Sequence, residues 1–117
     1  MKPEQTKKTH GVKCDLIPIQ LKQLLENCKF WIENKTFSPE EISIRFKHGL
    51  TSIHIFQYGN ERHSRLMCNI MMRQVYYQPL FTWGQKFDKN EAHSHYTKAL
   101  KKADIGEFEQ LIKYAQS

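Results

Sequence analysis

Apolar residues recur every three or four positions in the first half of the chain, which is the period of an amphipathic helix. In the segment 17–33 they form one stripe, made of Ile17, Leu21, Leu24, Leu25, Cys28 and Ile32. A second stripe lies in the segment 39–54 and contains Ile42, Phe46, Leu50 and Ile53. Ser38, Pro39 and Glu41 open this second segment as a capping box does. The pattern predicts helices over 17–33 and 39–54.

Three more helices are predicted in the second half of the chain. The helix over 61–77 has an apolar side made of Leu66, Ile70 and Val75 with Met67 and Met71. Another helix is expected over 90–102. A capping box is also suggested by Asp104 and by Glu107, three residues later. This pair predicts a last helix over 105–116. The fold class expected is therefore all-α, in one domain over 1–117, with a loop over 55–60 and a short hairpin or extended arm over 1–13.

The charge of +6 favours an anionic partner such as a nucleotide, a nucleic acid or an acidic protein. Lys98, Lys101 and Lys102 recur at helical spacing, which favours a solvated helix face over a groove that reads nucleic acid. The three cysteines are scattered and read as reduced thiols. No apolar run has the ~20 residues that a membrane span needs, and the first residues do not resemble a secretory signal. The expected localisation is cytoplasmic.

The stretch HIFQYGNERHSR, from His54 to Arg65, gathers the candidate chemistry. A helix ends at His54, a Gly-Asn turn follows, and the next helix begins with free N–H groups that suit a phosphate. Arg62 and Arg65 add two fixed cations, and a histidine can act as a general base near neutral pH. The alternative is an ordinary helix–turn–helix with solvated side chains.

These residues resemble the motif of the Fic proteins, H-x-F-x-[DE]-G-N-G-R-x-x-R. Six of its eight specified positions match, namely His54, Phe56, Gly59, Asn60, Arg62 and Arg65. The phrases IPIQLKQLL, FSPEEISIRF, RHSRLM, LFTWG and ALKKADIGEFEQLI are similar to the mobile mystery protein B branch of that family, in the same order. The likeness extends from about residue 5 to the C-terminus.

The resemblance implies a Fic-type all-α fold and transfer of AMP from ATP, as substrate, to a hydroxyl of a target protein. It implies that His54 deprotonates that hydroxyl, that Gly59 and Asn60 hold phosphates, and that Arg62 neutralises their charge. Arg65 would meet the γ-phosphate, and Phe56 would anchor the loop in the core. The N-terminal segment would be the flap, a hairpin that aligns the target chain by strand addition.

Two positions of the stretch from His54 to Arg65 depart from that motif. Tyr58 stands where the family has the acidic residue that holds Mg²⁺, so the role of this ion stays open. Glu61 replaces the second glycine and brings a negative charge near the phosphates. Because Glu61 and Arg65 are four residues apart on a helix, they are expected to pair. Glu61 is then either an inhibitory residue that occupies Arg65 or an ordinary glutamate at a helix start.

The resemblance also implies that the helices preceding the flap are missing, which would expose part of the apolar stripe over 17–33 and favour oligomers. The function expected is an impaired Fic-type transferase; the alternative is an inactive Fic-fold module that binds a protein, a nucleotide or an antitoxin-like partner. Nucleic-acid binding is the weakest candidate, since no base-reading motif occurs. His93 and His95 could share a metal only on a strand, and this segment is predicted to be helical. No metal ligand is therefore assigned.

Overall fold

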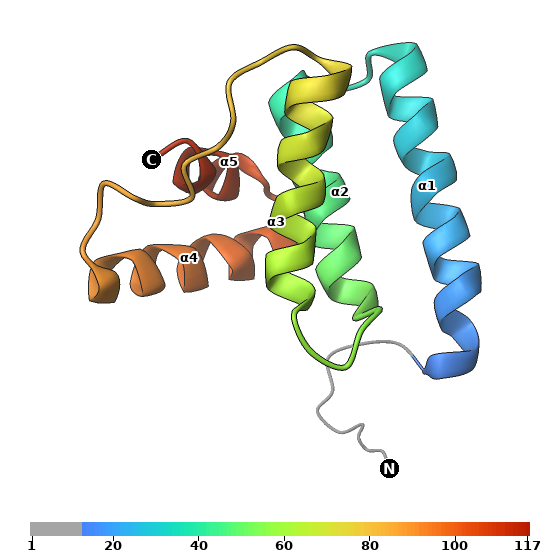
Figure 1. Cartoon of the computed structure of the whole chain (residues 1–117), viewed down its shortest axis with the longest axis horizontal. Coiled ribbons are helices and arrows are strands. Elements are labelled where there is room, and N and C mark those ends of the chain that lie inside the picture. The colour runs from blue at the N-terminus through green and yellow to red at the C-terminus, as the bar shows by residue number, and fades with distance from the viewer. Residues whose placement is uncertain (1–12) are drawn as a thin grey trace.

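The computed structural model describes residues 13–117, and within this range it is all-α, as predicted (Figure 1). A 3₁₀ turn (Cys14–Leu16) leads into α1 (Ile17–Asn34). The chain continues with α2 (Pro39–Ile53) and with α3 (Asn60–Ile70), which is extended by a π-helical segment, Met71–Val75. The last helices are α4 (Lys89–Asp104) and α5 (Glu109–Ala115). The hairpin or arm predicted over 1–13 falls, except for its last residue, outside the described residues.

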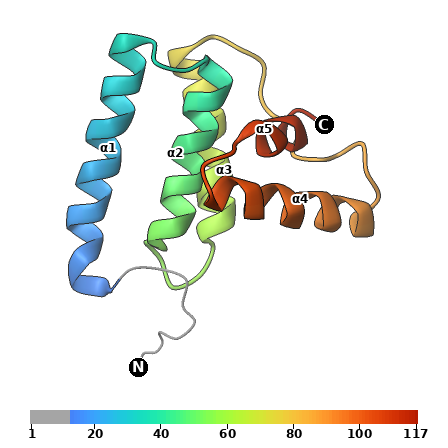
Figure 2. The same cartoon turned by 180° about the vertical axis from the view of Figure 1, so that it is seen from behind.

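Helix α2 is central because it is buried on two sides. Figures 1 and 2 show α1, α2 and α3 running nearly side by side, with α4 across their direction. On one side of α2, Ile42, Phe46, Leu50 and Ile53 pack with Leu24 and Cys28 of α1 and with Met71. On another side, Ile44 joins a cluster with Cys68, Met72 and Phe81 and with the small or apolar residues of α4 and α5, namely Ala99, Ala103, Leu111 and Ala115. The second side is the one that carries the candidate site.

The starts of α2 and α4 follow from their capping residues. The Ser38 hydroxyl accepts the Glu41 N–H at 3.1 Å, which confirms Ser38 as the cap, while the Glu41 carboxylate pairs with Arg45 at 2.8 Å. Helix α4 begins one residue before the predicted Asn90, because Asp88 and Glu91 form a reciprocal capping box. The reciprocal capping box thus forms at Asp88, where it was not predicted, whereas at α2 only the Ser38 half of the predicted box forms.

The prediction that Asp104 opens the last helix is wrong. Asp104 is the final residue of α4, and Gly106 follows it in the left-handed region with φ of 89°. The Gly106 N–H donates to the Ala103 carbonyl and the Glu107 N–H to the Lys102 carbonyl, both at 2.9 Å, which is the Schellman end of a helix. Helix α5 therefore starts at Glu109, four residues later than predicted.

The predicted apolar side of α3 is correct for Met67 and Met71, which pack in the core with α1 and α2, and wrong for Leu66, Ile70 and Val75. Leu66 is 57 % exposed, and Ile70 and Val75 are exposed as well, whereas Ser64 and Cys68 are buried. The small side chains of Ser64 and Cys68 occupy the contact face, where Cys68 packs in one cluster with Ile44 of α2. The apolar residues Leu66 and Ile70 lie on the opposite, solvent-facing side.

Among the glycines that the structure describes, Gly84 is expected to be the least tolerant of substitution. Its φ is +78°, and an added Cβ would lie 2.5 Å from Cε1 of the buried Tyr114 ring. We expect Gly84→Ala to lower the free energy of unfolding by about 2–4 kcal/mol, because overpacking adds to the strain of left-handed backbone. Urea unfolding of this variant measures the loss.

Gly106→Ala is the matched control, since Gly106 has a φ of +89° and a Cβ there would meet nothing within 4 Å. It should cost only about 1–2 kcal/mol, the strain alone. If the two variants lost equal free energy of unfolding, the contact with Tyr114 would not be the reason that Gly84 tolerates no larger residue.

Candidate functional site

The loop between α2 and α3 holds the histidine predicted to be catalytic. His54 terminates α2 in the left-handed conformation, with φ of 59°, and its side chain is exposed. Its N–H donates to the Leu50 carbonyl at 3.2 Å, so the backbone completes the last turn of the helix. A non-glycine residue in this conformation is uncommon. The imidazole is thereby presented to solvent at the start of the loop.

Asn60 fixes the shape of this loop. Its side-chain oxygen accepts the Phe56 N–H at 2.9 Å, and its side-chain nitrogen donates to the Phe56 carbonyl at 2.6 Å. The predicted core anchor is wrong, because Phe56 is 45 % exposed and packs edge-on against His63, with ring centroids 4.9 Å apart. The loop is held by the Asn60 amide and not by an aromatic residue in the core.

The first turn of α3 offers free N–H groups beside a cation. Gly59 precedes it with φ of 79° and provides no side-chain cap. The His63 N–H is bonded to the Gly59 carbonyl at 2.9 Å, so the N–H groups of residues 60, 61 and 62 lack intrahelical partners. Arg62 is exposed and makes no ion pair within residues 13–117. This end of α3 has the charge and the donors that attract an anion.

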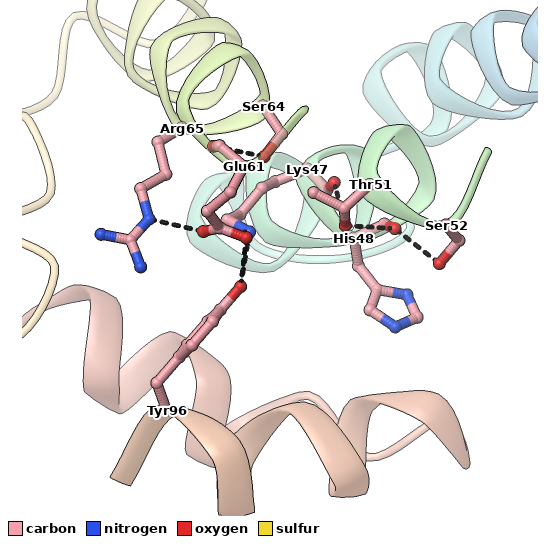
Figure 3. Close-up of polar contacts among 8 residues, drawn as sticks. All are labelled: Lys47, His48, Thr51, Ser52, Glu61, Ser64, Arg65 and Tyr96. Carbon is pink, nitrogen blue, oxygen red and sulfur yellow. Dashed lines mark hydrogen bonds and ion pairs between the residues drawn. The ribbon is translucent and has the colours of Figure 1, made fainter. Parts of the chain in front are cut away.

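Glu61 points from α3 toward α2 and α4 and accepts from three side chains (Figure 3). Its carboxylate lies 2.6 Å from Nε of Arg65, 3.0 Å from Nζ of Lys47 and 2.6 Å from the hydroxyl of Tyr96. Lys47 is fully buried, at 0 % exposure, and also donates to Tyr96 at 3.1 Å. The expected pairing of Glu61 with Arg65 is therefore confirmed. Glu61 ties three helices together and is more than a surface glutamate at a helix start.

The four side chains Lys47, Glu61, Arg65 and Tyr96 are here called the Glu61 network. Burial lowers the pKa of Lys47, and the charge of Glu61 opposes that fall. Burial alone would raise the pKa of Glu61, but the charge of Lys47 and three hydrogen bonds outweigh burial and hold this pKa below its ordinary value. Burial, followed by the charge of Glu61, raises the pKa of the Tyr96 phenol, so Tyr96 stays a hydrogen-bond donor. The network is thus one anion shared by two cations.

The depressed pKa of Glu61 predicts sensitivity to acid. A carboxyl whose pKa is lower in the folded chain stabilises the fold above its unfolded pKa, near 4.3, and this contribution is lost as pH falls through the folded value. We expect the free energy of unfolding to fall below about pH 5 and to fall less steeply in Glu61→Gln. Urea unfolding at a series of pH values measures both slopes, and identical slopes would contradict this assignment.

Arg65 faces aromatic rings as well as Glu61. Its guanidinium carbon lies 5.1 Å from the ring centroid of Trp83, 5.2 Å from that of Tyr96 and 5.9 Å from that of Tyr114. Such contacts favour an arginine over a lysine. Arg65 is therefore held between α3, α4 and α5, whereas the exposed Arg62 remains at the loop.

Lys47 and Tyr96 were missed by the sequence analysis. Lys47 interrupts an otherwise apolar face of α2, since Ile44 and Leu50 lie three residues to either side and both are buried. A lysine in such a position indicates a buried partner of opposite charge. Nothing in the spacing along the chain relates Tyr96, 35 residues beyond Glu61, to this position.

The residues present do not fit Mg²⁺ at the place where the resemblance expects it. Tyr58 is 82 % exposed, and a phenol supplies none of the carboxylate oxygens that this ion prefers. Within residues 13–117 no group of three or more His, Cys, Asp or Glu side chains is placed so that it could hold a metal ion. His93 and His95 both lie on α4, as predicted, and His95 stacks on Phe87 with ring centroids 4.2 Å apart.

No protein-family model, no curated protein and no solved structure matches this chain. Among the helices of the described part, none is both long enough and apolar enough to cross a membrane.

Proposed function

We propose that this chain is a Fic-type domain for transfer of AMP from ATP to a protein hydroxyl, held in a restrained state by the Glu61 network. The observation that carries the proposal is the arrangement of one loop: His54 is exposed at its start, and the free N–H groups of α3 and Arg62 lie at its end. A base and an anion site on one loop are what nucleotidyl transfer requires.

In the proposed reaction, His54 accepts the proton of the target hydroxyl. The hydroxyl oxygen attacks the α-phosphorus of ATP and forms the new ester bond. The bond between the α-phosphorus and its bridging oxygen breaks, and pyrophosphate leaves with the electron pair. Arg62 and the first N–H groups of α3 stabilise the negative charge on the phosphates. No step is assigned to Mg²⁺.

The restraint comes from the place of Arg65. The resemblance gives this arginine the γ-phosphate, but here its Nε donates to Glu61 and its guanidinium lies among three aromatic rings. Moving Arg65 to a phosphate would leave Glu61 with one cation, Lys47, in place of two. Glu61 therefore competes with ATP for Arg65, as an inhibitory residue would.

A second candidate is a binding module without transferase chemistry, for a protein partner or a nucleotide. Two features favour it: Tyr58 in place of an acidic residue, and the exposed position of Phe56, which leaves both rings available to a partner. In this case the loop would bind an anion without transferring AMP.

The experiment uses the double variant Lys47→Met, Glu61→Gly, which frees Arg65 without leaving a buried charge unpaired. This variant is incubated with ATP labelled at the α-phosphate and with candidate target proteins, beside the same variant carrying His54→Ala. If a target protein becomes labelled and this labelling is lost when His54→Ala is added, the result supports the transferase. ATP binding without label in either variant supports a nucleotide-binding module, and the absence of both label and ATP binding overturns the transferase and the nucleotide-binding form of the module.

A further inference from the structure

A cationic pocket of about 280 Å³ lies between the start of α4 and α5. It shares no lining residue with the loop between α2 and α3 or with the Glu61 network. Its polar wall includes Lys86, His95, Lys98, Gln110 and Lys113, with Phe87 beside them. The volume is just below the ~300–1,000 Å³ of typical small-molecule sites.

The side chains of this wall include three lysines and no acidic residue, and the wall also contains Ser117, the last residue of the sequence. Lys86, Lys98 and Lys113 supply three ammonium groups, and all three side chains are exposed. Lys113 has one neighbouring anion, Glu109, at 3.4 Å, but both side chains are largely in water, so this pair is weak and easily exchanged. The pocket therefore attracts an anion with more than one negative charge.

Phe87 orders two of these side chains before any ligand arrives. The imidazole of His95 stacks on its ring at 4.2 Å between centroids, with an angle of 19° between the planes. The ammonium of Lys86 lies 5.2 Å from the centroid of the same ring. Contacts of this kind reduce the entropy that the side chains lose when they bind.

We propose that this pocket binds a small phosphate monoester, independently of the proposed function. The phosphate carries about 1.5–2 negative charges at pH 7. The three lysine ammonium groups would hold it, each acting as a point charge. The remaining volume, beside the Gln110 amide and the Phe87 and His95 rings, receives the organic part. If inorganic phosphate bound alone, this part of the pocket would be filled by water.

The test is a titration with glucose 6-phosphate, followed by amide NMR at low salt, with glucose and inorganic phosphate as separate arms. We expect signal changes at residues 86–87, 95–99 and 110–114, none with glucose, and an affinity for glucose 6-phosphate several-fold above that for inorganic phosphate. The variant Lys98→Gln, Lys113→Gln should bind at least about tenfold more weakly, through loss of two charged contacts. Arg62→Ala should bind as the unchanged chain does, which separates this site from the proposed ATP site.

The matched control is Lys22→Gln, Lys29→Gln, which removes two exposed lysines of α1 and the same net charge. It should change the affinity less than about twofold at moderate salt. The proposed phosphate site would be overturned if the two double variants lost affinity for glucose 6-phosphate equally. It would also be overturned if signals changed over all lysine-bearing surfaces. Equal affinity for inorganic phosphate would overturn the assignment to an ester.

Discussion

Glu61→Gln is expected to lower the free energy of unfolding by about 2–3 kcal/mol, a large part of the stability of a domain this size. The glutamine keeps the shape of the side chain but leaves the ammonium of Lys47, at 0 % exposure, without a counter-charge. Breaking a buried ion pair costs ~3–5 kcal/mol, and the 43 % exposure of Glu61 reduces that figure. Urea unfolding measures the difference.

Glu41→Gln is the matched control for this change. Glu41 also lies in the first turn of a helix and pairs with an arginine four residues later, Arg45, at 2.8 Å, but it has no buried lysine beside it. Its loss should cost less than about 1 kcal/mol. Adding Lys47→Met to Glu61→Gln should restore most of the stability, because the buried charge is then gone. If Glu41→Gln and Glu61→Gln lose equal stability, Lys47 does not depend on Glu61.

The second large effect is expected in the affinity for ATP. The double variant Lys47→Met, Glu61→Gly should bind ATP about ten- to a hundredfold more tightly than the unchanged chain, because a charge-assisted hydrogen bond of ~1.5–3 kcal/mol from Arg65 becomes available to phosphate. Calorimetric titration of the two proteins with ATP measures this gain.

Arg65→Ala in the background of that double variant provides the control. It should remove the gain, while the chain with Arg65→Ala alone should bind ATP as weakly as the unchanged chain does. A gain that persists without Arg65 would assign the effect to Glu61 itself, through its charge near the loop. If the double variant gained no affinity for ATP, the idea that Glu61 restrains Arg65 would have to be dropped from the proposed function.

Helix positions followed from the sequence wherever a local signal determines them. Ser38 and Pro39 begin α2 as predicted, because an N-terminal cap depends on residues three apart in the chain. Asp104 and Glu107 carry the same spacing, yet Gly106 between them ends α4 in a left-handed turn. The glycine outweighs the cap, since it is the residue that a Schellman turn needs.

The buried face of α3 could not be predicted from hydrophobicity alone. Leu66 and Ile70 have the spacing of a core stripe, yet Ser64 and Cys68 form the contact with the neighbouring helices. A close helix approach requires small side chains, and only the tertiary arrangement shows where that approach occurs. The exposed leucine and isoleucine were therefore placed on the wrong side.

The candidate site was predictable in its local part and not in its distant part. The pairing of Glu61 with Arg65 follows from helical spacing, and His54 lies at the helix end as predicted. Lys47 and Tyr96 join them from other helices, through contacts that no local pattern encodes. These two residues turn a simple pair into a network that spans three helices.

The most direct test of the restraint is the ¹⁵N–¹H signal of the Arg65 Nε–H, observed while ATP is added to the unchanged chain. Arg62→Lys and Arg65→Lys assign the two arginine signals. We expect the Arg62 signal to move with ATP while the Arg65 signal stays in place, because Glu61 retains its hydrogen bond at 2.6 Å. Movement of both signals over the same range of ATP concentration would contradict the restraint of Arg65 by Glu61.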